Sequence, residues 1–219
     1  MLPEGGSFGL GPSRTMDAAV THADRLSKTV RPGRIIVVRH GRPVLNRNEG
    51  PHLDWKSYRD WWSRYEQSPL AEEQKCSEAL MREIPDDAIM LSSVRPRAMQ
   101  TAKHLAQGKD VTHHDLFNEA PLPPPRWKSR HLPKTWNKIA RLAWLFGHHD
   151  GDEHVRDAQE RAGKAADVLI ERAGEGRDVV LAAHGWFNRM LRPHLRKRGW
   201  TCVHDGGDKY WSYRIYEKK

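Results

Sequence analysis

Three short apolar runs, each followed at once by polar side chains, do most to limit the folds open to this chain. Residues 34–39, 88–91 and 178–183 are continuous and rich in β-branched or aliphatic residues, which is typical of buried strands in a largely parallel sheet. Helical patterns separate them. The sequence therefore predicts an α/β fold, a three-layer sandwich with a mostly parallel sheet flanked by helices, and a site at the carboxyl ends of the strands.

The segments around these runs show further periodicity. Helices are expected at residues 53–67, 71–83, 97–106, 136–146, 153–173 and 186–197, the last with an interruption at Pro193. A short strand is expected at 110–114 and an edge strand at 210–216, where apolar and polar residues alternate. The prolines between Pro121 and Pro133 predict a long irregular loop.

Length and charge set the broad class. The 219 residues predict one domain over residues 33–219, after a flexible N-terminal leader over residues 1–32 that is rich in Gly, Pro, Ser and Thr. No apolar run approaches the roughly 20 residues that span a bilayer, and we recognise no secretory signal. We therefore expect a cytoplasmic protein with no membrane partner. The net charge of +9 favours anionic partners such as phosphorylated small molecules, acidic proteins or nucleic acid.

Each strand ends at residues that suit phosphate chemistry. The junctions carry Arg39, His40, Gly41 and Arg42, then Ser92, Ser93, Arg95 and Arg97, then His184 and Gly185. Phosphoryl transfer needs an in-line nucleophile and positioned cations, and a guanidinium can bind phosphate through two bonds. A histidine nucleophile divides the reaction into two easier steps. The glycine after each histidine would permit a sharp turn and a close approach of the backbone to a ligand.

These motifs resemble those of the histidine phosphatase (phosphoglycerate-mutase-like) superfamily. Arg39-His40-Gly41 followed by Asn46 is similar to its RHG-x(4)-N signature, and Ala183-His184-Gly185 is similar to its second catalytic histidine. Residues 92–102, SSVRPRAMQTA, are similar to its SS-x(3)-RA-x-QTA helix start. The order and spacing agree over residues 35–191.

The resemblance implies roles for most of these residues. His40 would attack phosphorus, while Arg39, Arg97 and His184 would bind the phosphoryl oxygens. Asn46 would help to hold phosphate, and Gly41, Gly185 and Arg42 would border the substrate.

The resemblance also implies an acid that protonates the leaving oxygen and then activates water. Glu119 stands where that acid is expected, and Asp115 is its nearest rival. Arg42-Pro43 replaces the acidic residue and threonine that many members carry, which adds positive charge. No metal and no organic cofactor is implied.

The predicted activity is hydrolysis of phosphomonoesters, because the Glu-Arg-His-Tyr-Gly segment of the mutase branch is absent. Segments 47–70 and 121–150 are long enough to cover the site, which favours a phosphorylated small molecule. One alternative is a phosphohistidine protein phosphatase. Another is a catalytically weak module that binds phosphorylated ligands or nucleic acid.

Two other clusters have more ordinary interpretations. Residues 148–154, rich in histidine and acid, could hold a metal, but their acids fit the first turn of the following helix better. The basic and aromatic segment 126–136 could stack on nucleic acid, but such runs are usually solvated faces or lids.

Overall fold

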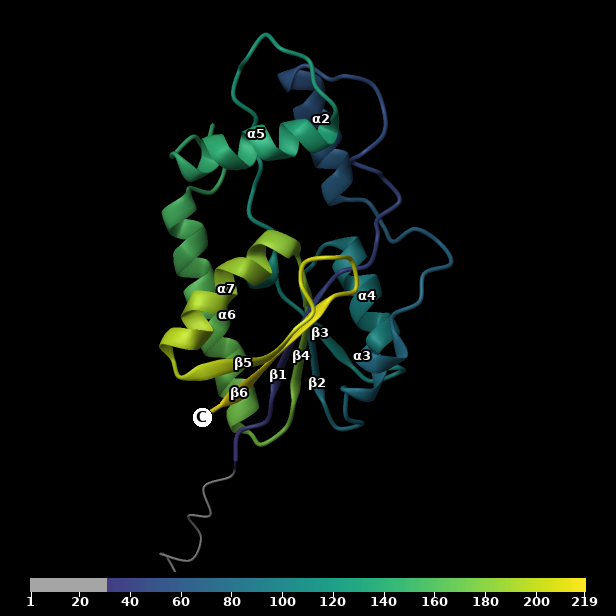
Figure 1. Ribbon diagram of the computed structural model, residues 1–219, viewed down its shortest axis with the longest axis vertical. Coiled ribbons are helices and arrows are strands. Elements are labelled where there is room, and N and C mark those ends of the chain that lie inside the picture. Colours follow the sequence, from purple (N-terminus) through teal and green to yellow (C-terminus); the bar gives the residue numbers. More distant parts are fainter. Residues whose placement is uncertain (1–30) are drawn as a thin grey trace, which may run out of the picture. The chain divides into compact units, whose positions relative to one another are not determined.

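A six-stranded mixed sheet forms the centre of the computed structural model, which describes residues 31–219 (Figure 1). Its strands are β1 (Ile35–Arg39), β2 (Ile89–Ser92), β3 (Val111–His113), β4 (Val179–Ala183), β5 (Trp200–Asp205) and β6 (Tyr213–Lys218), in the order β3-β2-β4-β1-β6-β5. Strands β1 to β4 run parallel, and β6 pairs antiparallel with both β1 and β5. The expected leader lies outside the described residues except for its last two.

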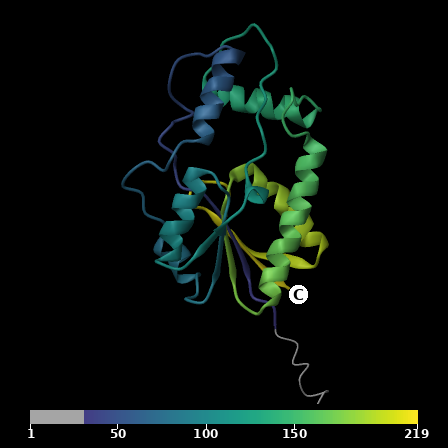
Figure 2. The ribbon, with the colours of Figure 1, turned by 180° about the vertical axis from the view of Figure 1, so that it is seen from behind.

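Helices cover both faces of the sheet, which confirms the predicted three-layer fold. Within the described residues the helices are α2 (Trp55–Glu66), α3 (Glu78–Arg82), α4 (Pro96–Ala106), α5 (Pro133–Leu145), α6 (Val155–Gly174) and α7 (Gly185–Lys197). The buried alanines of α6 and the apolar face of α7 pack on one side of the sheet, and α3 and α4 pack on the other (Figures 1 and 2). Strands β1 and β4 are therefore buried from both sides, which explains their continuous apolar sequences.

Helices α2 and α5 form a separate layer, here called the cap, beyond the carboxyl ends of the parallel strands (Figure 1). Their contact is aromatic: the Tyr58 and Trp136 rings stack with centroids 5.6 Å apart. The polar atoms of both rings are satisfied, because the Tyr58 hydroxyl donates to Asn137 and the Trp136 indole donates to the Leu53 carbonyl. The aromatic stripe that the sequence places on α2 is thus the core of the cap.

The helix expected at 71–83 is shorter than predicted and spans only Glu78–Arg82. Residues 71–74 are held instead by the segment that follows β1. The Ala71 amide donates to the Arg42 carbonyl, and the Gln74 side chain pairs with both backbone groups of Arg42. Ser77 then caps the short helix by accepting from the Leu80 amide.

The strand expected at 210–216 is present as β6, but it starts later than predicted and does not lie at an edge of the sheet. Strand β6 begins at Tyr213 and lies between β1 and β5, and β5 was not predicted because most of its side chains are polar and partly or fully exposed. Pro193 does not interrupt α7, whose buried apolar face continues to Leu195. None of the helices within residues 31–219 has the length and apolar character that crossing a bilayer requires.

Candidate active site

A cavity of about 480 Å³ is lined jointly by the carboxyl edge of the sheet and by the cap. Of the residues predicted from sequence, it brings together Arg39, His40, Arg97, Glu119 and Gly185. The cap contributes Trp62, Tyr65 and one face of α5. Segments that the motifs leave far apart in the chain therefore meet at one place.

His40 follows β1 and is only 3% exposed. Its Nδ1 lies 2.7 Å from the Gly41 carbonyl oxygen, and because a carbonyl can only accept, Nδ1 carries the ring proton. The lone pair therefore resides on Nε2, where the Arg97 Nε donates to it over 3.2 Å. Burial, followed by the charges of Arg97 and Arg39, lowers the pKa of His40 well below its usual 6.5. His40 is thus a neutral imidazole that borders the cavity.

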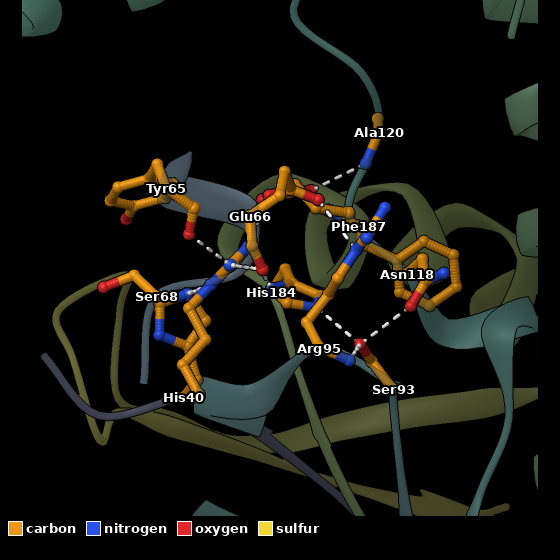
Figure 3. A network of polar contacts seen from close by, with 12 residues as sticks. His40, Tyr65, Glu66, Ser68, Ser93, Arg95, Asn118, Ala120, His184 and Phe187 are labelled. Carbon is orange, nitrogen blue, oxygen red and sulfur yellow. Dashed lines mark hydrogen bonds and ion pairs between the residues drawn. The ribbon is translucent and has the colours of Figure 1, made fainter. Parts of the chain in front are cut away.

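His184 follows β4 and is completely buried, with its ring edge-on to His40 at a centroid distance of 5.2 Å. Its Nε2 lies 2.8 Å from the Ser93 hydroxyl, which donates its own proton to Asn118 (Figure 3). Nε2 must therefore be the donor, which leaves Nδ1 to accept from Arg97 over 3.2 Å. Burial and the neighbouring Arg97 charge lower the pKa of His184 well below 6.5.

Arg97 connects the two histidines to the cap. Beside its bonds to His40 and His184, it donates to the carbonyls of Tyr65 and Glu66 at 3.0 and 3.1 Å and to the Glu66 carboxylate at 2.7 Å. A guanidinium has five N–H groups, so all of them are used within the protein. Any bond from Arg97 to a phosphoryl oxygen therefore requires the exchange of one of these contacts.

Glu66, at the last position of α2, is a site residue that the sequence interpretation missed. Its carboxylate pairs with Arg95 over 2.8 Å (Figure 3). It also pairs with Arg97, and the residue is only 8% exposed. The available signal was its position directly after Tyr65, at the end of the buried stripe. An acid there is ordinarily solvated, so the pattern alone does not assign it.

The loop between β5 and β6 supplies two more missed residues. The Arg39 guanidinium lies 4.4 Å from the centre of the Tyr210 ring and donates to the Asp208 carbonyl. The Nε of Arg39 is buried with no partner in the described part of the chain. Arg39 therefore retains one donor for a ligand.

The two glycines that follow the histidines lie against side chains. A Cβ on Gly185 would lie 3.1 Å from Arg39 Nε, and a Cβ on Gly41 would lie 2.6 Å from the Trp211 ring. Neither glycine has a positive φ, so close packing explains their lack of a side chain better than backbone conformation does. Gly185 also lines the cavity, whereas Gly41 does not.

Glu119 is fixed at the start of α7. Its two carboxylate oxygens accept from the backbone amides of Trp186 at 3.1 Å, Phe187 at 2.8 Å and Ala120 at 3.0 Å. The rival Asp115 has a side chain that is 77% exposed, pairs with His114 and does not line the cavity. Of the two candidate acids, Glu119 is the one that lines the cavity.

Three predicted substrate-binding residues, Asn46, Arg42 and Gly41, do not line the cavity. The Asn46 amide donates to Glu49, and Arg42 is exposed, with its backbone bound to Gln74. Arg47, which the motif interpretation did not single out, lines the cavity instead.

Two acids of segment 148–154, the candidate metal site, pair with arginines instead. Asp150 pairs with Arg59 and Arg126, and Glu153 pairs with Arg161. Within residues 31–219, no three metal-ligating side chains converge. Of the charged residues in segment 126–136, Lys134 alone lines the cavity.

Known proteins are similar to this chain in sequence and in fold. The family model for the histidine phosphatase superfamily (branch 1) matches residues 35–205. A mycobacterial hydrolase is 22% identical with a TM-score of 0.57, over 84% of this chain and 88% of that one.

Two further solved structures are similar. A mycobacterial glucosyl-3-phosphoglycerate phosphatase in complex with VO3 is 21% identical with a TM-score of 0.54, over 84% of this chain and 92% of that one. A phosphoglycerate mutase from Bacillus anthracis is 17% identical with a TM-score of 0.51, over 86% and 90%. At these identities the similarity concerns the fold, and no curated protein matches the sequence.

The buried ion pair predicts a specific loss of stability. Replacing Glu66 by Gln leaves the buried Arg97 cation without a counter-charge, so the free energy of unfolding in urea should fall by about 3 kcal/mol. Glu160→Gln removes one partner of an exposed pair with Lys164 and should leave stability close to wild type. Equal effects of the two substitutions would show that the Glu66 pair is not a structural requirement.

The lowered pKa values predict how the two histidines titrate. Nitrogen NMR should find both rings neutral at pH 6, with the proton on Nδ1 of His40 and on Nε2 of His184. Because the unfolded chain takes up protons near pH 6.5 and the folded one does not, the free energy of unfolding should decrease as the pH falls below 6.5. Signals assigned through His40→Asn and His184→Asn that show imidazolium at pH 6 would contradict this description.

Proposed function

Because this chain belongs to branch 1 of the histidine phosphatase superfamily, we propose that it is a metal-independent phosphatase that hydrolyses phosphomonoesters through a phosphohistidine on His40. The observation that carries the proposal is the neutral, buried His40 beside a cavity rich in cations. A neutral imidazole has a lone pair to donate, and the surrounding charges attract a phosphate ester.

In the first step, the lone pair of His40 Nε2 attacks phosphorus and the bond from phosphorus to the ester oxygen breaks. Glu119, in its protonated form, gives a proton to the leaving oxygen, and the alcohol departs. In the second step, the Glu119 carboxylate takes a proton from water, whose oxygen attacks phosphorus. The bond between phosphorus and Nε2 breaks, and inorganic phosphate leaves.

Arg97 would exchange its hydrogen bond to His40 for one to a phosphoryl oxygen during the reaction. Its Nε–H donates to the same lone pair that attacks phosphorus. Formation of the bond to phosphorus releases this donor beside the phosphoryl oxygens, where it offsets their charge. The unpartnered Nε of Arg39 would supply a second donor. His184, held by Ser93 and Arg97, would keep this arrangement in place through its ring contact with His40.

The cap supports a small-molecule substrate. Trp62 and Tyr65 of α2 and one face of α5 line the cavity, so the predicted covering segments contribute to its walls. The solved structures at similar fold include a phosphatase named for glucosyl-3-phosphoglycerate, a phosphorylated small molecule. No observation favours a phosphoprotein or nucleic acid in the same way.

The test is hydrolysis of p-nitrophenyl phosphate by the purified protein, with and without EDTA. Activity should survive EDTA and should fall by at least about a thousandfold in His40→Ala, because the nucleophile is lost. His52→Ala alters an exposed histidine outside the cavity and should retain wild-type activity. Activity that persists in His40→Ala, or that EDTA abolishes, would overturn the proposal.

A further inference from the structure

One face of α5 is directed at the cavity. The residues of α5 that line it are Lys134, Asn137, Lys138, Arg141, Leu142 and Leu145. Their spacing of three and four places them along one side of a helix, while Trp136, Ala140 and Trp144 on the other side are buried. Lys134, Lys138 and Arg141, here called the α5 cation row, extend over about 10 Å at the usual helical rise.

The α5 cation row has no counter-charge. Across residues 31–219, no carboxylate lies within ion-pair distance of any of its three members. Glu119 and Asp208 are the acids that line the cavity, and both are engaged elsewhere. Glu119 accepts from backbone amides, and Asp208 pairs with Arg189 and Arg214. Like charges gathered without an acid repel one another, which indicates that an anionic ligand completes the site.

Arg141 and its neighbour Trp186 have buried hydrogen-bond donors without a partner among residues 31–219, which supports an anionic ligand at this place. Its guanidinium lies 4.8 Å from the ring centres of both Trp144 and Trp186, and it donates to the Ala120 carbonyl at 3.0 Å. Its Nη1 is buried without a partner in the described region, as is Nε1 of Trp186. Burial lowers the pKa of Arg141 to about 10, so the group is charged at neutral pH. Arg141 Nη1 and Trp186 Nε1 are therefore two buried donors beside the cavity that a ligand oxygen would satisfy.

The total charge exceeds what one phosphate needs. Seven arginine and lysine side chains and two acidic side chains line the cavity, an excess of five positive charges. A phosphomonoester carries at most about two negative charges at neutral pH. The α5 cation row lies on the cap, whereas His40 and Arg39 end a strand of the sheet. A single phosphoryl group at His40 therefore offsets only part of the positive charge that lines the cavity.

We propose that the substrate carries a second phosphoryl group, which the α5 cation row binds while His40 attacks the first. This inference rests on the proposed phosphatase function. The ammonium groups of Lys134 and Lys138 are compact charges suited to phosphate, and the guanidinium of Arg141 can offer an N–H at fixed geometry. Leu142, Leu145 and Trp62 line the same cavity and would contact the apolar part that joins the two phosphates.

The test compares three esters on one four-carbon chain: butane-1,4-diol bisphosphate, 4-phosphooxybutanoate and butane-1,4-diol monophosphate. In moderate salt, kcat/KM for the bisphosphate, halved for its two equivalent ends, should exceed that for the monophosphate by at least about tenfold. The kcat/KM for the carboxylate should lie between these two values.

Two variants test the α5 cation row itself. Lys138→Met and Lys134→Met should each reduce the ratio of kcat/KM for the bisphosphate to kcat/KM for the monophosphate by about tenfold, the loss expected for one charged contact. Lys128→Met changes an exposed lysine in the loop before α5 that does not line the cavity, and it should leave the ratio unchanged.

Binding to His40→Ala separates this inference from the proposed function. Calorimetry should give a Kd for the bisphosphate at least about tenfold below that for the monophosphate, and Lys138→Met on this background should remove the difference. Equal kcat/KM and equal Kd for the two esters would overturn the second phosphate site even if His40 is required for hydrolysis. A preference for the carboxylate would overturn the assignment to a phosphoryl group. Tight bisphosphate binding without turnover would contradict only the phosphatase function.

Discussion

The arrangement of the site depends on one buried cation. Arg97 is 1% exposed, and a charge so far from water is tolerated only if it is paired and its donors are satisfied. Glu66 supplies the opposite charge, and the carbonyls of Tyr65 and Glu66 and the two histidines take the remaining donors. The same side chain thereby fixes the end of α2 against the ends of β1 and β4. The cap and the floor of the cavity are therefore joined by one network of hydrogen bonds and ion pairs.

This network also determines the chemistry of the histidines. Protonation of either ring would add charge beside Arg97 in a buried environment, which is why the pKa of each imidazole is well below its usual value. With both rings neutral, the backbone carbonyl at Gly41 and the hydroxyl of Ser93 select which nitrogen carries the proton. The result is a lone pair on Nε2 of His40, as a nucleophile requires. The positive charge needed for phosphate is carried instead by the guanidinium and ammonium groups that line the cavity.

The sequence predicts the parts of the site that are local. The buried strands are continuous apolar runs, and His40, Arg97 and His184 follow them at motif spacings, so the fold class and the floor of the cavity could be found. Glu66 and the α5 cation row could not, because their roles arise only when the cap packs over the sheet. Tyr210 lies on a loop between two strands, one of which was not predicted. Asn46 shows the converse: it fits the motif, yet its amide is bound to Glu49 outside the cavity.

The most direct test of the account is the steric course of hydrolysis at phosphorus, measured with an isotopically chiral phosphate ester. Attack by His40 followed by attack of water on phosphohistidine inverts phosphorus twice, so overall retention of configuration is expected. The measurement does not require the intermediate to accumulate. Overall inversion would mean that water attacks the ester directly, and His40 would then not be the nucleophile.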